Sequence, residues 1–345
     1  MMDEGTTALV VAGISASVSI LVAVSALVSS LLTANKTASN DAKLATLESG
    51  LRDVEAARNA RLDYEYEALK HLYSECEPLL FQFFELADDA ESRIRALARE
   101  CRNGSLRPDG SGWLADPSYY FDSTVYRLSA PLAAIRILQR RLTAVDLDLD
   151  SRLKTQYRLL RILYRSITDD QAIAERNPRL PYDPDSADPE DPDRDALIAA
   201  DPQKYLRQGM YRGNLDRLVD AMIIREQERE RVMSFGEFLQ FKRDSRTELF
   251  QLMPYLELLL IGFHPTVRPV LWRVLVTQKL LYDALRASRD LDRSGPTNLD
   301  ALVARGWDAT LTALDWRKDE TDADNEAVSS PMSAARMYIV ETAQA

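Results

Sequence analysis

The sequence predicts an all-α membrane protein: a single N-terminal transmembrane helix, a short stalk and a multi-helix cytoplasmic bundle. Three observations lead to this prediction. A long uncharged apolar run lies near the N-terminus, apolar residues recur at helical spacing along most of the chain, and no stretch alternates like a strand. The composition, 46% hydrophobic and 28% charged with 12 glycines in 345 residues, also favours a helix-rich fold over a turn-rich β fold.

The chain divides into six segments by composition and periodicity. We expect a transmembrane anchor (1–34), a stalk or short coiled coil (35–60), a first helical half of the body (61–176), an acidic proline-rich linker or loop (177–202), a second helical half (203–317) and an acidic, disordered tail (318–345). The pattern leaves open whether the two halves form one bundle or two lobes.

The anchor is predicted from the run Ala8–Leu32, which lies within a longer stretch without charged side chains. As a helix, its twenty-five residues would extend about 37 Å, enough to cross a hydrocarbon core of about 30 Å. A cleaved secretory signal would be shorter and would begin with basic residues, whereas this chain begins with Asp3 and Glu4. The run therefore predicts a retained anchor.

Lys36, Lys43 and Arg52 follow the anchor, and no lysine or arginine precedes it. The positive-inside rule then places the N-terminus outside and the body in the cytoplasm, at the plasma (inner) membrane. The 35 arginines against 8 lysines are typical of a GC-rich bacterial genome.

Two stripes at three-four spacing predict self-association. The first consists of small residues in the anchor, which allow close helix packing in lipid: Ala12, Ala16, Ser19, Ala23, Ala26 and Ser30. The second consists of apolar residues in the stalk: Leu44, Leu47, Leu51 and Val54. The stalk stripe spans less than two heptads before Arg58, so the same residues could instead begin a long helix that packs on its own body.

The body has helical periodicity in several segments. Pro78 and Pro131 fall inside two of them, and Asp116–Pro117 has the pattern of a helix start. The run Leu256–Phe263 is too short to span a bilayer and predicts a buried core helix. We expect helices over 62–102, 117–144, 149–174, 215–229, 235–263, 265–281 and 299–316.

No catalytic or nucleotide-binding pattern is present, so we expect no cofactor and favour a non-enzymatic role. The chain lacks G-x-x-x-x-G-K-[ST], G-x-G-x-x-G and G-x-S-x-G motifs. Cys76 and Cys101 lie in apolar helical stretches and predict buried thiols in a reducing compartment, and His71 is badly spaced to activate Cys76. His264 stands at a predicted helix junction, where it would satisfy backbone groups.

Carboxylate pairs are the remaining candidates for metal binding. Asp88–Asp89 and Asp169–Asp170 faintly resemble the aspartate-rich motifs of terpenoid enzymes, but each lacks the third aspartate of D-D-x-x-D. The alternating Asp146, Asp148 and Asp150 lack the glycine and glutamate of an EF-hand loop and fit an acidic helix N-terminus better.

Basic residues concentrate between Arg93 and Arg165, where 14 basic residues stand against 7 acidic ones in a chain of net charge −11. Such a surface could contact anionic lipid, hold the acidic segment 183–201 or consist of locally paired, solvated side chains. The overall acidity argues against nucleic acid. The predicted basic surface comprises Arg136, Arg140, Arg141, Arg152, Arg158, Arg161 and Arg165.

These observations rank three hypotheses for function. The first is a membrane-tethered, self-associating scaffold or adaptor that binds a protein partner at the cytoplasmic face. The second is an oligomerising membrane effector of the stress or phage-defence type, whose anchor perturbs the bilayer through serines at 15, 19, 25, 29 and 30. The third is a helical enzyme with a metal–carboxylate site at Asp88, Asp89, Asp169 or Asp170.

Overall fold

A computed structural model gives the fold as two compact units, Met1–Glu67 and Ala68–Ala345. Side chains are described from Leu21 onward, except those of residues 34, 37–39, 42, 326 and 328. The backbone is described for residues 4–142, 146–176, 180–187, 193–227, 229–291, 298–317 and 326–344.

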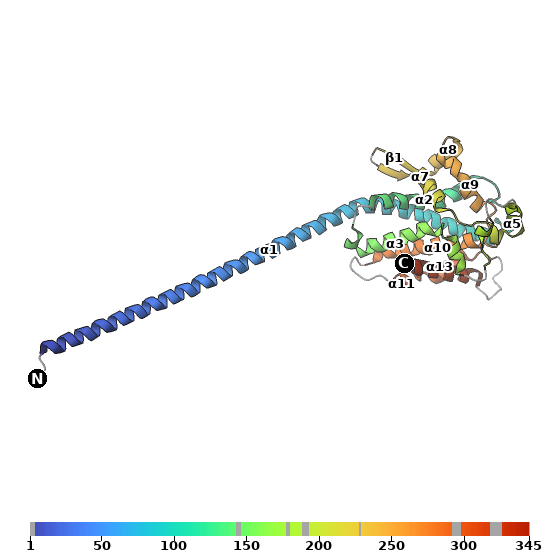
Figure 1. Ribbon diagram of the computed structural model, residues 1–345. Helices are drawn as coiled ribbons and strands as arrows, with labels where there is room; N and C mark the ends of the chain where they lie inside the picture. Colours follow the sequence, from blue (N-terminus) through green and yellow to red (C-terminus); the bar gives the residue numbers. More distant parts are fainter. Residues whose placement is uncertain are drawn as a thin grey trace. The chain divides into compact units, whose positions relative to one another are not determined.

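A single helix, α1 (Glu4–Arg102), contains all described residues of the first unit and continues into the second (Figure 1). The segments expected from the sequence as anchor, stalk and first body helix are therefore one helix without a break. Pro78 lies inside α1 without ending it. The sequence left open that the stalk residues begin a long helix that packs on the body. The long helix is confirmed, because α1 runs from the stalk into the body.

No helix in the described part of the chain is both long enough and apolar enough to cross a membrane. The side chains of residues 1–20, which include the first half of the predicted anchor, lie outside the described residues.

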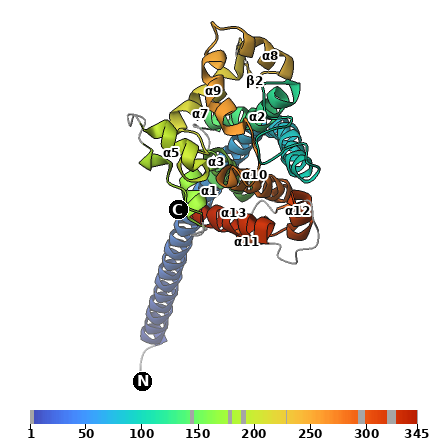
Figure 2. The same ribbon diagram turned by 90° about the vertical axis from the view of Figure 1, so that its right-hand side faces the viewer.

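The second unit is built around α10 (Pro269–Ala287), in which every residue from 270 to 282 is buried. Its apolar residues lie on most of its circumference, as expected for a helix enclosed by others, and polar residues such as Lys279 and Asp283 interrupt them. It packs against α13 (Glu326–Gln344), α3 (Ser151–Ser166), α4 (Asp170–Glu175) and α11 (Leu299–Val303) (Figure 2).

A second group of elements packs around α2 (Tyr119–Arg141). Its members are α7 (Arg212–Ala221), β1 (Ile223–Glu226), β2 (Arg229–Val232), α8 (Phe235–Arg243) and α9 (Glu248–Leu260). Apolar side chains of α2, α7, α9 and α10 surround an internal cavity of about 20 Å³. The two halves predicted from the sequence thus share one core. The short elements are η2 (Leu147–Leu149), η3 (Pro184–Ser186), α5 (Arg194–Ala200), α6 (Pro202–Tyr205), η4 (Ser288–Asp290) and α12 (Trp307–Leu314).

Side-chain caps determine where several helices begin. Ser118, rather than the predicted Asp116, caps α2, and its Oγ accepts a hydrogen bond from the Phe121 N–H. Asp150 caps α3 in the same way, which confirms that the alternating aspartates mark a helix N-terminus. Ser234 and Glu237 form a reciprocal capping box at α8.

The predicted helix over 215–229 is wrong in its second half. The helix α7 ends at Ala221, and β1 and β2 form an antiparallel hairpin in which Ile223 pairs with Val232. Both of these residues are buried, whereas the charged residues toward the turn are largely exposed. Each strand has only four residues, and those next to the turn are charged, so the alternation of a strand cannot be recognised in the sequence. The helix was therefore predicted to continue to residue 229.

The predicted disordered tail is also wrong for most of its length. Residues 326–344 form α13, and Met332, Ala335, Tyr338 and Ile339 are buried against the body. Apolar residues recur in this segment at spacings of three and four, which is typical of a helix. The disorder was predicted from the acidic run that precedes them. Residues 318–325 of the predicted tail lie outside the described residues.

Two further differences are smaller. The predicted helix over 235–263 is divided into α8 and α9 because Thr247 caps a new helix, its Oγ1 accepting from the Phe250 N–H. The predicted linker contains short helical segments, and Ala187 within it is buried.

Candidate functional site

Four large apolar side chains of the stalk are exposed. Leu44, Leu47, Leu51 and Val54 have exposed fractions between 57% and 66%. Within the described residues of the first unit, α1 is the only element, so nothing in this unit covers them. Burying such a side chain contributes about 1.5–3 kcal/mol, which makes this surface the clearest candidate for contact with another chain.

The anchor stripe and the stalk stripe share one heptad phase. Ser30 and Leu44 are 14 residues apart, which is two heptads, and α1 continues between them without interruption. Ala23 and Ala26 are exposed, and the side chains of the first three stripe residues, Ala12, Ala16 and Ser19, lie outside the described residues. We call the positions in this heptad phase the seam, of which the Thr37 side chain also lies outside the described residues: Ala12, Ala16, Ser19, Ala23, Ala26, Ser30, Thr33, Thr37, Asn40, Leu44, Leu47, Leu51 and Val54.

Charged residues flank the seam in a complementary order. Lys36 and Lys43 occupy heptad g positions, Asp41 and Glu48 occupy e positions, and all four are exposed. In a parallel coiled coil, a g residue faces the e residue five positions later on the partner helix. Each lysine of one copy would then face an acid of the other. Antiparallel packing would instead place like charges together.

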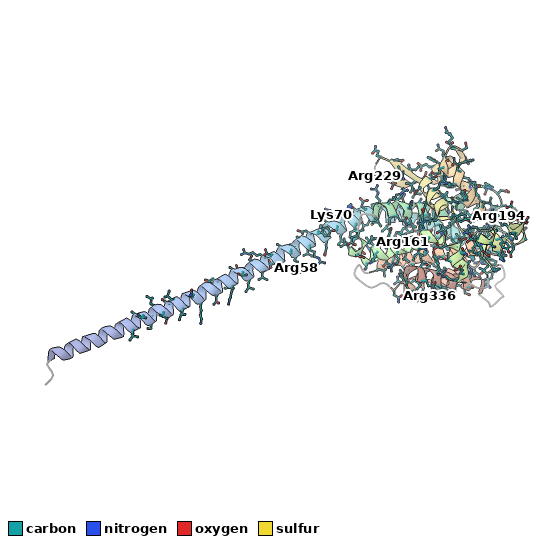
Figure 3. The ribbon with its side chains drawn as sticks, viewed as in Figure 1. Arg58, Lys70, Arg161, Arg194, Arg229 and Arg336 are labelled. Atoms are coloured by element: carbon teal, nitrogen blue, oxygen red, sulfur yellow. The ribbon has the colours of Figure 1, made fainter. Side chains whose placement is uncertain are left out.

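The seam ends at Val54, because arginines occupy the next two positions. Arg58 and Arg61 are exposed, and Arg61 donates a hydrogen bond to Glu65 at 2.8 Å on the same helix. Figure 3 shows Arg58 on this part of α1. The apolar part of the stalk is therefore bounded on its C-terminal side.

The predicted basic surface is mostly engaged in ion pairs within the body. Arg136 and Arg140 both contact Asp220, at 3.1 and 2.6 Å, and Arg140 also contacts Glu230 at 3.2 Å. The other pairs are Arg141–Glu75 at 3.8 Å, Arg152–Asp150 at 3.9 Å and Arg165–Asp169 at 3.2 Å.

Arg158 and Arg161 of α3 remain exposed and form no ion pair within the described chain (Figure 3 labels Arg161). None of the seven arginines pairs with a described residue of segment 183–201. Most members of the predicted basic surface are therefore paired locally, which was one of the three interpretations drawn from the sequence.

Three of the four tandem aspartates make protein contacts, and Asp89 is exposed. Asp88 pairs with Arg286 at 2.5 Å, and Asp169 accepts a hydrogen bond from the Tyr338 hydroxyl at 2.8 Å. Asp170 is buried and contacts Tyr182 and Arg207. In the described residues, no three His, Cys, Asp or Glu side chains come close enough to hold a metal ion.

Both cysteines are buried free thiols. Burial, reinforced by neighbouring carboxylates, raises the pKa of Cys76 to about 11 and that of Cys101 to about 12. The reactive thiolate is therefore scarce at neutral pH.

We expect neither thiol to react with Ellman's reagent at pH 7.5 in the folded protein, and both to react in concentrated urea. Ser74→Cys is the matched control, because Ser74 is exposed on the same helix and its substitute should react at once. Rapid labelling of Cys76 or Cys101 in the native chain would show that this part of the body opens.

The sequence did not reveal a cluster of charges between α1 and α10 whose centre is buried and whose outer members, Asp88 and Arg286, are exposed. We call Asp88, Glu91, Lys279, Asp283 and Arg286 the ion cluster. Lys279 lies 3.4 Å from Glu91 and 2.5 Å from Asp283, and Arg286 lies 2.5 Å from Glu91. The side chains of Lys279 and Glu91 are only 5% and 7% exposed. Each charge has an opposite partner, so the cluster joins α1 to α10.

No known protein family, curated protein or solved structure matches this chain.

Proposed function

We propose that this chain is a membrane-tethered, self-associating helical scaffold whose body binds a protein partner at the cytoplasmic face. The observation that carries the proposal is the seam: small residues and stalk leucines share one heptad phase on one uninterrupted helix. Small residues favour close packing in lipid, and leucines favour packing in water, so one pair of helices could use both.

The flanking charges support a parallel arrangement of copies. Lys36 would face Asp41, and Lys43 would face Glu48, of the second copy. A parallel arrangement is also what a shared membrane anchor requires, since all copies insert with the same orientation. The apolar run Ala8–Leu32 and the basic residues that follow it support the anchor and its orientation, with the N-terminus outside.

An apolar patch on α9 supports the binding of a protein partner. Phe250, Tyr255 and Leu258 are 44%, 46% and 61% exposed, and Pro254 lies beside them on the exposed side of the helix. Large exposed apolar side chains that gather on one helix face are typical of protein interaction sites.

The membrane-effector alternative has weaker support. The Ser25 and Ser30 hydroxyls donate to the carbonyl oxygens of Val22 and Leu27, both at 2.9 Å. These hydroxyls are satisfied within their own helix, so they do not need a polar partner or water in the bilayer.

The seam is tested by charge substitution and mass measurement of the full chain in detergent or nanodiscs. We expect the wild-type chain to be an oligomer and Leu47→Lys/Leu51→Lys to be a monomer, because lysines at core positions would bring like charges together. Ala45→Lys/Ser49→Lys adds the same charge away from the seam and should remain oligomeric.

Orientation is tested by cross-linking. Val54→Cys should form a disulfide between two copies in a parallel arrangement, where equivalent residues meet, and the buried native cysteines should not interfere. A monomeric wild-type chain would contradict self-association, and an oligomer that the Leu47/Leu51 variant retains would place the contact elsewhere.

A further inference from the structure

A hollow lies beside the N-terminal end of α10, in the second unit. Its volume is about 360 Å³, within the range of small-molecule sites. Its walls are mostly apolar and aromatic, and they come from α10, from Trp316 and from the start of α13. The main lining residues are Leu180, Pro269, Trp272, Arg273, Trp316 and Pro331.

Arg273 is the only charged side chain among the described residues that line this hollow. It is 3% exposed, and its buried Nη1 has no hydrogen-bond partner in the described residues. Burial without a counter-charge lowers the pKa of its guanidinium to about 10. An arginine side chain in this state is costly unless an anion accompanies it.

Further hydrogen-bond donors near Arg273 also lack partners. The Nε1 atoms of Trp272 and Trp316 are buried and donate to no acceptor among the described residues. Arg268, at the N-cap of α10, is 8% exposed and unpaired at Nε and Nη1, with only its Nη2 donating to the Ile261 carbonyl at 3.1 Å. This end of α10 therefore carries an excess of donors and of positive charge.

The other cations in the body meet their charge in different ways: Arg93, which is buried, donates to the Ser123 hydroxyl at 2.9 Å and lies over the Tyr120 ring, whereas two others have carboxylate partners. Lys279 contacts Glu91 and Asp283, and Arg207 contacts Asp170 at 3.5 Å. Arg273 differs from them because it has no ion pair in the described residues and lines a hollow. The backbone N–H groups of residues 270 and 271, at the N-terminus of α10, donate to Gln208 Oε1. These two N–H groups are therefore already paired within the protein, in contrast to Nη1 of Arg273.

We propose that this hollow binds a small organic anion, with its carboxylate or phosphate on the Arg273 guanidinium and its apolar or aromatic part against Trp272 and Trp316. The planar guanidinium suits both acid groups, and the proline- and tryptophan-rich wall suits a hydrophobic body. The site goes beyond the proposed scaffold function and does not depend on self-association.

The test uses the full chain in detergent with two anionic probes, phenylacetate and phenyl phosphate, and the neutral probe phenylacetamide. Tryptophan fluorescence and calorimetry report binding. We expect saturable binding of at least one anion, at least about tenfold tighter than that of the amide, because a hydrogen bond to a charged group is involved. Equal affinity for phenylacetate and phenylacetamide, or no saturable anion binding at millimolar concentration, would overturn the proposal.

Variants assign the binding to Arg273. Arg273→Met keeps an unbranched apolar side chain and should weaken anion binding by at least about tenfold, while Arg158→Met, an exposed arginine elsewhere, should leave it unchanged. Arg273→Met should also raise the melting temperature without probe, because it removes an unpaired buried charge. Arg273→Lys retains the charge and should retain part of the affinity.

Anion affinity that Arg273→Met leaves intact would overturn the assignment. The chain itself has acidic residues at 319, 320, 322 and 324, close in sequence to Trp316. A chain in which these four are replaced by asparagine or glutamine is therefore a second control. If only that variant bound the probes, the chain's own carboxylates would be the occupant, and the proposal would be wrong.

Discussion

Replacing Glu91 by glutamine should lower the free energy of unfolding by about 3–5 kcal/mol, since it removes one partner from a buried group of charges. Glu91 accepts from Arg286 at 2.5 Å and lies 3.4 Å from both Lys279 and Arg95. Lys279, with a 5% exposed side chain, would retain only Asp283. Urea denaturation of the full chain, followed by tryptophan fluorescence, measures the loss, because all four tryptophans lie in the second unit.

The effect should depend on pH in a defined direction. Burial disfavours the Glu91 carboxylate, but the hydrogen bond from Arg286 and the charges of Lys279, Arg286 and Arg95 outweigh burial and lower its pKa. A lowered carboxyl pKa gives stability that is present above the ordinary value of 4.5 and is lost as the pH falls through the folded-state pKa. The difference between wild type and Glu91→Gln should therefore shrink in acid.

Two further variants separate charge pairing from other causes. Glu85→Gln alters an exposed acid on the same helix and should change stability by less than about 0.5 kcal/mol. Glu91→Gln/Lys279→Met removes both partners and should be more stable than Glu91→Gln alone, because the buried lysine charge, which Glu91→Gln leaves with one partner, is removed as well. A loss below about 1 kcal/mol for Glu91→Gln would mean that the cluster is effectively solvated.

Helical periodicity was sufficient to predict most helices of this fold, and it failed where an element was short or its context was misleading. The core helix α10 and the amphipathic α3 carry apolar residues on enough consecutive turns to be recognised. The hairpin at 223–232 buries only Ile223 and Val232 at its base, so two strands of four residues left no measurable alternation. The acidic run before α13 concealed an apolar face that ends in Tyr338 and Ile339.

The charged sites were harder to predict, because their partners lie far away in sequence. Glu91 and Arg286 are separated by 195 positions, and a charge on an amphipathic helix is solvated in most proteins. One signal was nevertheless available. Arg273 and Lys279 lie within a largely apolar helix that is buried on most sides, and a charge in that setting is either paired or available to a ligand. The seam was easier to predict, because the residues of each stripe are only three or four positions apart in the sequence.

Gly209→Ala should destabilise the second unit by about 3 kcal/mol or more, through overpacking and the loss of buried hydrogen bonds. A Cβ at this position would lie 2.4 Å from Asp170 Cγ and 2.7 Å from its Oδ1, and its backbone is not in the left-handed region. Asp170 cannot move aside easily, because it is 1% exposed and contacts Tyr182 and Arg207.

The backbone around Gly209 is also fixed on both sides. The Gln208 N–H donates to the Tyr182 hydroxyl at 2.7 Å, and the Met210 N–H donates to the Ile167 carbonyl at 2.8 Å. Gln208 also holds the first turn of α10, so a shift here would disturb the end of the helix that carries Arg273.

Gly213→Ala is the matched control, since a Cβ there meets nothing within 4 Å and the residue lies in α7. That substitution should be neutral or stabilising by up to about 1 kcal/mol. If Gly209→Ala proved as stable as its control, Asp170 and the segment 207–210 would have to be mobile. The N-terminal end of α10, on which the anion site depends, would then not be held in place by Gln208. If instead only Gly209→Ala is destabilised, the close packing of Asp170 against this glycine is what holds Gln208, and through it the first turn of α10, in position.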